Sequence, residues 1–127
     1  GILNSAVCSK AVADTITRAL KAVTEDGTAK RLKGAKCSVA GKTGTSFGTY
    51  ANGKYVDEHG RRKYQGTFVG FFPAEDPQYS IISVVYSKPT NKSFQGGGIP
   101  AKAIRTVIDR IYDIDPYFQE TLRQKRK

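Results

Sequence analysis

Apolar side chains recur with the period of an α-helix in two segments, one in each half of the chain. The first stripe, of 3.6-residue period, consists of Val12, Ile16, Ala19, Leu20 and Val23. Ser9 precedes this stripe as a suitable N-cap, and Gly27 follows it as a left-handed terminator. The pattern therefore predicts an amphipathic helix over residues 10–25.

The second helical stripe follows a cluster of three glycines at 96–98. It consists of Ile104, Val107, Ile108, Ile111 and Tyr112. Pro100 stands in the first turn, where helices accept proline, and the pair Asp115-Pro116 ends or breaks the pattern. These signals predict a helix over residues 101–113.

Three segments between the helices have the composition of β-strands. Residues 67–72 and 79–86 are rich in β-branched and aromatic side chains, and residues 38–46 begin as a strand with many small side chains. Asn52-Gly53 is a strong hairpin signal, and His59-Gly60 is a weaker turn signal. The short connection at 73–78 makes the last two strands antiparallel neighbours. The order predicts an α+β fold, a three-stranded antiparallel sheet with flanking helices.

Composition limits the classes of protein that remain. The chain has 127 residues, which suits one small domain, and no stretch is long and apolar enough for a membrane helix. Cys8 and Cys37 lack any metal-ligand spacing with His59, so neither a metal nor another cofactor is expected. The net charge of +10 raises one alternative, a small basic nucleic-acid-binding module, but the Lys and Arg residues are scattered and form no nucleic-acid motif.

The candidate chemistry lies in a Gly-Lys-Thr-Gly segment at 41–44. A phosphate-binding loop would require glycine at position 36, which is Lys36, and the residues after Thr43 read as extended rather than helical. Lys42-Thr43-Gly44 instead matches the K-T-G element of penicillin-binding proteins and class A β-lactamases.

The surroundings of this tripeptide resemble the transpeptidase domain of class B penicillin-binding proteins, the family of septal and elongation peptidoglycan D,D-transpeptidases. Residues 40–45 resemble the K-T-G-T strand of that family, and residues 25–29, 66–77 and the glycine cluster with its helix resemble the family in the same order. The resemblance covers residues 7–112. It implies the penicillin-binding-protein and serine β-lactamase-like fold, with acyl transfer through a serine.

The resemblance implies roles for four consecutive residues. Lys42 would add positive charge and orient the serine of an S-x-N element, and the Thr45 N–H would donate to the oxyanion. The hydroxyls of Thr43 and Thr45 would hold the terminal carboxylate of a substrate or a β-lactam, and Gly44 would let the substrate lie along the strand. The expected catalytic residues are Lys42 and Thr45; the expected substrate-binding residues are Lys42, Thr43, Gly44 and Thr45.

The chain lacks the other two elements of the family. No serine has lysine three residues later, as S-x-x-K requires, or asparagine two residues later, as S-x-N requires. Residues 1–127 are therefore predicted to be the C-terminal portion of a transpeptidase domain whose nucleophile-bearing half is absent, and to be inactive alone. The alternative within the same fold is a fragment of a β-lactamase or a β-lactam sensor.

The resemblance also implies ligands, partners and location. Peptidoglycan stem peptides and β-lactams are the expected ligands, the division or elongation machinery is the expected protein partner, and nucleic acid is not expected. The parent protein is expected at the cell inner membrane, anchored by a segment absent here, with its catalytic domain on the periplasmic side. The strand at 79–86 would lack its family neighbour, so its open edge predicts self-association.

Overall fold

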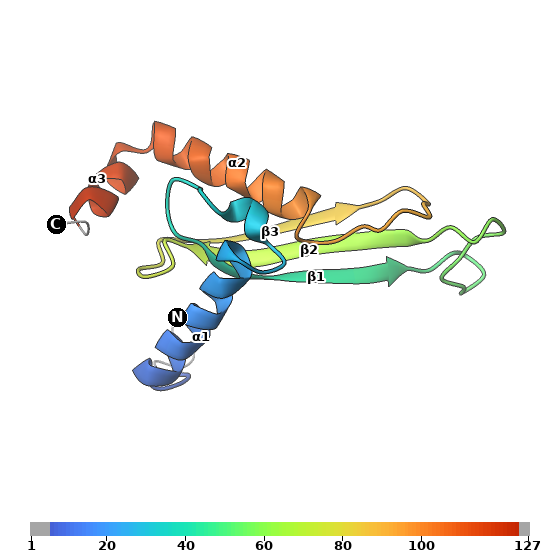
Figure 1. The fold of residues 1–127 in the computed structure, drawn as a ribbon, viewed down its shortest axis with the longest axis horizontal. Helices are drawn as coiled ribbons and strands as arrows, with labels where there is room; N and C mark the ends of the chain where they lie inside the picture. Colours follow the sequence, from blue (N-terminus) through green and yellow to red (C-terminus); the bar gives the residue numbers. More distant parts are fainter. Residues whose placement is uncertain (1–5, 125–127) are drawn as a thin grey trace.

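The computed structural model describes residues 6–124, which form an α+β domain as expected (Figure 1). Its elements are α1 (Lys10–Glu25), the 3₁₀ turn η1 (Lys30–Leu32), β1 (Ala40–Gly48), β2 (Lys63–Phe72), β3 (Tyr79–Tyr86), α2 (Ile99–Ile114) and α3 (Pro116–Gln124). The predicted helix at 10–25 and the predicted strand at 79–86 are confirmed to the residue. Within residues 6–124, no helix is both long enough and apolar enough to cross a membrane.

Within residues 6–124, the strands form one antiparallel sheet in the order β1-β2-β3. The central strand β2 contributes Phe68, which is fully buried at the middle of the core. Thr43 of β1 lies opposite Phe68, whereas Lys42 lies opposite Val69. Because opposite residues of antiparallel strands point to the same face, Thr43 shares the Phe68 face of the sheet and Lys42 belongs to the other face.

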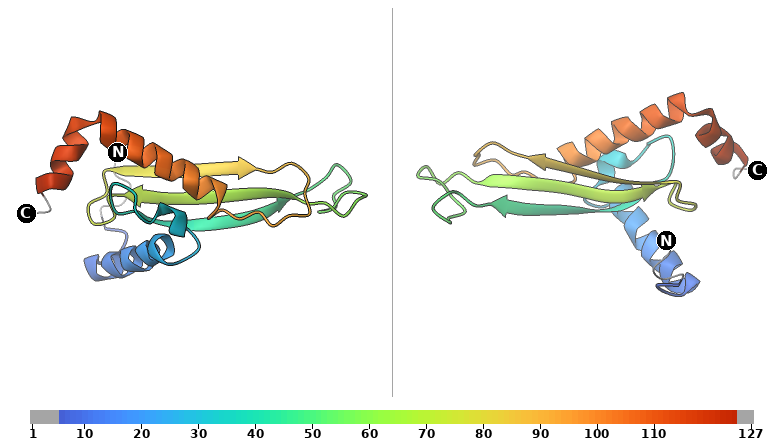
Figure 2. Two further views of the ribbon diagram at one scale, coloured as in Figure 1. Left: turned by 45° about the horizontal axis from the view of Figure 1, so that its top comes forward. Right: turned by 180° about the vertical axis from the view of Figure 1, so that it is seen from behind.

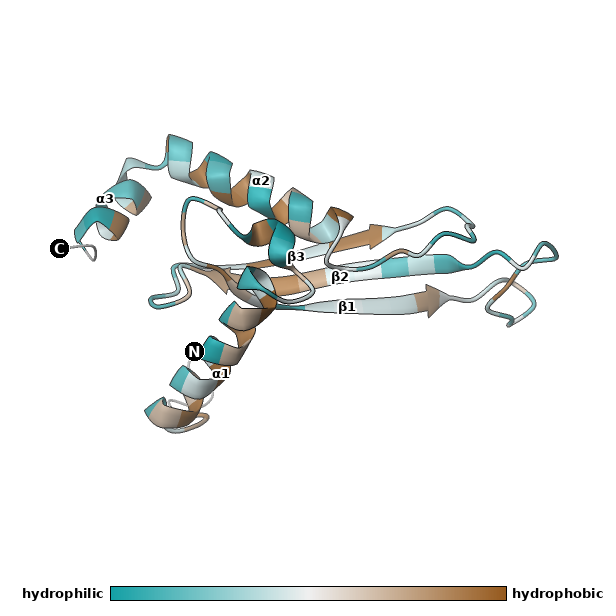
Figure 3. Ribbon diagram, viewed as in Figure 1, coloured by the Kyte–Doolittle hydropathy of each residue, from teal (hydrophilic) through white to brown (hydrophobic). Residues whose placement is uncertain are grey.

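Helices cover the two faces unequally. α2 lies along the Phe68 face, and the C-terminal end of α1 reaches the same core through Val23, while the rest of α1 projects away from the sheet (Figure 2). The apolar stripe of α2 faces the sheet (Figure 3), and Ile104 and Ile108 pack with Phe68 in the core. Burying each such side chain stabilises the fold by about 1.5–3 kcal/mol. At the C-terminal end of α1, the buried Thr24 hydroxyl donates to the carbonyl oxygen of Val39 at 2.6 Å.

The chain continues in a third helix where the sequence predicted only a break. Asp115 ends α2 and caps α3, because its carboxylate accepts from the backbone N–H of Phe118 at 3.1 Å. Pro116 is the first residue of α3, a position that needs no backbone N–H donor. Phe118 is almost fully buried, and its ring meets those of Phe72 and Tyr79. This aromatic contact anchors α3 to the end of the sheet.

The two predicted ends of α1 have different outcomes. Ser9 is confirmed as the N-cap, since its hydroxyl accepts from the Val12 N–H at 3.4 Å. The prediction that Gly27 is a left-handed terminator is wrong, because the glycines with positive φ among residues 6–124 are Gly34, Gly53 and Gly60. A Cβ at Gly27 would instead lie 2.8 Å from Val23 Cα, so the close return of the chain requires glycine here.

The sheet face opposite α2 carries apolar side chains that residues 6–124 leave uncovered. Ile82 is 64% exposed, and its neighbours Val69 and Val84 are also exposed. Along α1, Val12 and Ile16 are about half exposed. Within residues 6–124, the outer edge of β3 pairs with no strand. Contiguous exposed apolar surface of this kind is typical of a surface that another chain segment or another molecule covers.

Candidate active site

The four predicted site residues lie together in the first half of β1, with the backbone extended. β1 pairs with β2 and with no other strand of residues 6–124, so its outer edge is accessible. Lys42 is exposed, and its Nζ donates to the carbonyl oxygen of Thr43 at 3.0 Å. The alternation of the strand places Thr43 and Thr45 on the α2 side of the sheet and Lys42 on the opposite side.

The hydroxyls of Thr43 and Thr45 line an open pocket of about 360 Å³. The pocket also includes Thr28, from the turn after α1, and the loop before α2; its full lining is Thr28, Thr43, Thr45, Ser93, Phe94, Gln95, Gly96 and Gly97. The Oγ1 atoms of Thr28 and Thr43 lie 2.8 Å apart, within hydrogen-bond distance. The Gly96 N–H donates to Thr45 Oγ1 at 3.2 Å. Each of the two hydroxyls is therefore in hydrogen-bond contact with a residue outside β1: Thr43 with Thr28, and Thr45 with Gly96.

The sequence did not assign Thr28 or the 93–97 loop to the site. The turn containing Thr28 resembled the family, but its contact with a residue fifteen positions later depends on how α1 and β1 pack. The loop can lie this close to the sheet because the residue nearest to the strands is Gly96. An added Cβ there would lie 2.3 Å from Thr67 O and 2.4 Å from Gly44 O. The loop backbone thus rests directly on β1 and β2.

Gly44 itself has free space beside it. The nearest atom to an added Cβ would be the Thr67 Cβ at 3.9 Å, an ordinary van der Waals contact. Nothing within residues 6–124 therefore demands glycine at position 44 for packing. This free space lies on the Lys42 face of the sheet, opposite the pocket that Thr43 and Thr45 line.

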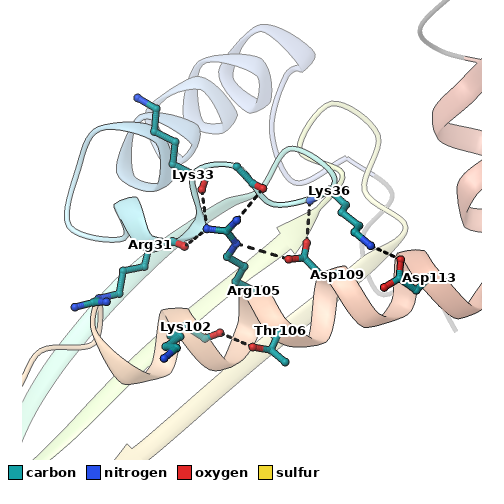
Figure 4. Close-up of polar contacts among 9 residues, drawn as sticks. Arg31, Lys33, Lys36, Lys102, Arg105, Thr106, Asp109 and Asp113 are labelled. Carbon is teal, nitrogen blue, oxygen red and sulfur yellow. Dashed lines mark hydrogen bonds and ion pairs between the residues drawn. The ribbon is translucent and has the colours of Figure 1, made fainter.

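A clamp from α2 fixes the chain that leads into β1 (Figure 4). The Arg105 guanidinium donates to the carbonyl oxygens of Lys33 and Gly34, both at 3.1 Å, and lies 3.6 Å from the carboxylate of Asp109. Asp109 in turn accepts from the Lys36 N–H at 2.9 Å. Two neighbouring side chains of one helix turn thus satisfy backbone groups in the connection between α1 and the K-T-G-T strand.

Replacing Arg105 by methionine is expected to lower the free energy of unfolding by about 2 kcal/mol. Methionine retains apolar contacts along the side chain but leaves the two carbonyl oxygens without their charged donor. Urea unfolding followed by circular dichroism measures the change. The matched control is Arg110→Met, an exposed arginine on the same helix. Equal losses in the two variants would contradict the clamp.

The two cysteines are free thiols in different environments. Cys8 is exposed, whereas Cys37 is partly buried just before β1. Burial, together with the nearby negative charge of Asp109, raises the pKa of the Cys37 thiol to about 12. Among residues 6–124, no group of His, Cys, Asp and Glu side chains is placed to hold a metal ion.

Iodoacetamide at pH 8 is expected to modify Cys8 rapidly and Cys37 hardly at all in the folded chain. The thiolate is the reactive form, and at this pH a thiol with a pKa near 12 is almost fully protonated. Peptide mass spectrometry after timed quenching gives the two rates separately. Denaturation in urea before alkylation should make the rates similar, and equal rates in the folded chain would contradict the burial of Cys37.

The structure thus places a K-T-G-T sequence on an accessible edge strand of an antiparallel sheet, with α2 packed on one face of that sheet. K-T-G is an element of penicillin-binding proteins and class A β-lactamases, so the strand and its motif point to this class of proteins. Residues 2–109 match the family described as Penicillin binding protein transpeptidase domain. The chain belongs to this family, and the resemblance inferred from the sequence is confirmed.

Curated relatives within the family carry the name of peptidoglycan D,D-transpeptidases. The chain is 33% identical over 116 residues to the probable peptidoglycan D,D-transpeptidase PenA of Neisseria gonorrhoeae. This alignment covers 87% of the present chain and 19% of the relative. The chain is 29% identical over 116 residues to the peptidoglycan D,D-transpeptidase FtsI of Buchnera aphidicola, with 89% of this chain and 19% of the relative covered. The chain thus spans about a fifth of the length of these relatives.

Solved structures show the same fold. The transpeptidase domain of the FtsI4 D,D-transpeptidase from Legionella pneumophila aligns with a TM-score of 0.64 at 29% identity, covering 85% of this chain and 38% of that chain. Penicillin-binding protein 2B from Streptococcus pneumoniae aligns with a TM-score of 0.67 at 22% identity, covering 90% of this chain and 17% of that chain. The predicted fold class is therefore confirmed.

Proposed function

We propose that this chain is the C-terminal part of the catalytic domain of a peptidoglycan D,D-transpeptidase, which cross-links stem peptides through an acyl-serine and binds β-lactams. The observation that carries the proposal is the pair of hydroxyls, Thr43 and Thr45, on an open pocket beside an accessible strand edge. Membership of the family supports it, as do the names of the relatives.

The two hydroxyls are suited to hold the terminal carboxylate of a stem peptide. Thr45 Oγ1 already accepts from the Gly96 N–H, so its own proton is directed elsewhere and can be donated to a carboxylate. Thr28 holds Thr43 Oγ1 from the opposite side of the pocket, and we assign it as a positioning residue. The positive charge of Lys42 adds long-range attraction for the same anionic group.

The acyl-transfer step also requires a nucleophile and an oxyanion site. In our proposal, a serine from the missing half attacks the carbonyl of the penultimate D-alanine, and the Thr45 N–H donates to the resulting oxyanion. The side chain of Lys42 belongs to the uncovered face with Val69 and Ile82. We propose that the serine-bearing half covers this face, which brings its S-x-N serine within reach of Lys42.

The location and partners follow from this assignment. We propose that the parent protein is anchored in the inner membrane through an N-terminal segment, with this domain on the periplasmic side, and that it works with the division or elongation machinery. Without the serine-bearing half, the outer edge of β3 and the exposed Ile82 favour self-association of the isolated chain.

The test of this function is binding of a pentapeptide ending in D-Ala-D-Ala, followed by amide and methyl NMR of the chain. The signals of Thr43 and Thr45 are expected to shift on titration, and Thr45→Val should weaken binding about tenfold through loss of one hydrogen bond to a charged group. Thr106→Val, on the exposed side of α2, is the matched control. Shifts that avoid the pocket, or an equal loss in the control, would contradict the proposed site.

The isolated chain is expected to form no acyl adduct with a fluorescent penicillin, because no serine lies in an S-x-x-K sequence. Denaturing gel electrophoresis and intact mass spectrometry after incubation measure the labelling. The parent protein, with the serine-bearing half present, is the positive control. Stoichiometric labelling of a serine in the isolated chain would refute the absence of the nucleophile.

A further inference from the structure

Four aromatic rings form a continuous row on the α2 side of the sheet, leading away from the pocket. Their centroids are separated by 6.2 Å from Phe94 to Tyr64, 5.2 Å from Tyr64 to Phe47 and 6.5 Å from Phe47 to Tyr55. We call Phe94, Tyr64, Phe47 and Tyr55 the aromatic strip. Phe94 also lines the pocket with Thr43 and Thr45, so the strip and the pocket are continuous.

The outer end of the strip is both exposed and positively charged. Phe47 is 45% exposed and Tyr55 57%, whereas Phe94 and Tyr64 are partly covered. The Arg62 guanidinium lies over the Phe47 ring, 4.8 Å from its centroid. Within residues 6–124, Arg62 makes no ion pair with a carboxylate. Its positive charge therefore remains available to an anionic ligand.

The sequence predicted a first strand over residues 38–46 and a second that begins at residue 67. The structure instead extends β1 to Gly48, and β2 begins at Lys63, four residues earlier than predicted. Tyr50 donates its hydroxyl proton to the Arg61 carbonyl at 3.0 Å and lies beneath Lys63, while Tyr55 turns to Phe47. The longer hairpin is what carries Phe47 and Tyr55 beyond the pocket.

Resting on the proposed function, we infer that the aromatic strip holds the amino-sugar end of the peptidoglycan substrate, whose terminal carboxylate lies in the pocket. A pentapeptide in extended conformation spans about 16 Å. Phe47 lies two strand residues beyond Thr45, about 7 Å away, so a substrate running from Thr45 along β1 passes Phe47 with its stem peptide. Its sugars then reach the outermost ring of the strip, Tyr55.

The surface of a saccharide and the surface of the aromatic strip are chemically complementary. Saccharide rings present apolar C–H faces that pack on aromatic rings, while their hydroxyl and acetamido groups keep contact with water. Half-exposed aromatic side chains provide both environments at once. Arg62 adds a planar cation whose N–H groups can donate to the acetamido and amide oxygens near the junction of sugar and stem peptide. The sugar-binding surface is thus separate from the Thr43 and Thr45 hydroxyls but lies on the same path.

The experiment compares two probes on this chain by isothermal titration and NMR: the D-Ala-D-Ala pentapeptide, and the same pentapeptide linked to its amino-sugar disaccharide. The disaccharide is expected to tighten binding about tenfold, through one or two aromatic contacts. Tyr55→Ala should remove that advantage and leave the affinity for the free pentapeptide unchanged, because Tyr55 lies beyond Phe47 at the outer end of the strip. Tyr117→Ala, an exposed aromatic residue on α3, is the matched control.

Each outcome has one meaning. Equal affinity for the two probes in the unmodified chain, or an equal loss for both probes in Tyr55→Ala, overturns the sugar site. Binding of the pentapeptide reports on the proposed function by itself, so a failure there is distinct from a failure of the sugar increment. If Tyr55→Ala unfolds, Tyr55→Leu, which removes the aromatic ring and keeps an apolar side chain, decides; retention of the full sugar increment in the folded variant overturns the inference.

Discussion

Gly97→Ala is expected to separate the loop before α2 from the K-T-G-T strand and to destabilise the chain by about 3 kcal/mol. A Cβ at this position would lie 1.7 Å from the carbonyl oxygen of Thr28, a backbone atom that no side-chain rotation can move aside. The backbone at Thr28 or at Gly97 must shift. Because Thr28 Oγ1 contacts Thr43 Oγ1, that shift also breaks the support of the site hydroxyl.

Two measurements separate the effect on stability from the effect on the site. Urea unfolding gives the loss of free energy, and methyl NMR at Thr43 reports whether the pocket is rearranged in the chains that remain folded. Gly48→Ala, in β1, is the matched control, because its added Cβ would meet only the Lys63 side chain, at 3.4 Å. An unchanged Thr43 environment in Gly97→Ala would show that the loop does not hold the pocket in shape.

The elements that the sequence predicted best are those whose signals are local. α1 has its apolar stripe and its Ser9 cap within one segment, and β3 is a run of β-branched and aromatic residues. The K-T-G-T strand was found for a similar reason, since four adjacent residues with an ordered context predict both a strand and the family to which it belongs.

What the sequence did not predict depends on contacts between distant residues. α3 exists because Phe118 packs against Phe72 and Tyr79, which a sequence that reads Asp115-Pro116 as a break does not reveal. Thr28 belongs to the pocket because α1 and β1 pack closely enough to bring two hydroxyls to 2.8 Å. The extra length of β2 similarly reflects the contact of the Phe47 and Tyr64 rings across the ladder.

Lys42→Met is expected to slow acylation of the parent protein by a fluorescent penicillin by a factor of about 10²–10³. In the proposed site, the lysine is a positive charge that faces the serine of the missing half and attracts the ligand carboxylate at long range, from the sheet face opposite the Thr43 and Thr45 hydroxyls. Removing it weakens charge stabilisation where the transition state develops. In the isolated chain the side chain is exposed, so the same variant should leave the free energy of unfolding nearly unchanged.

This contrast distinguishes a chemical role from a structural one. Stopped-flow labelling of the parent protein gives the acylation rate constant and the affinity separately, and Lys102→Met, an exposed lysine on α2, controls for the loss of one surface charge. Thr45→Val, which removes a single hydroxyl, should mainly weaken affinity rather than the rate constant. If Lys42→Met were acylated as fast as the Lys102→Met control, the positive charge of Lys42 would take no part in the reaction. Misfolding could not explain that result, because the strand that carries residue 42 would still be folded.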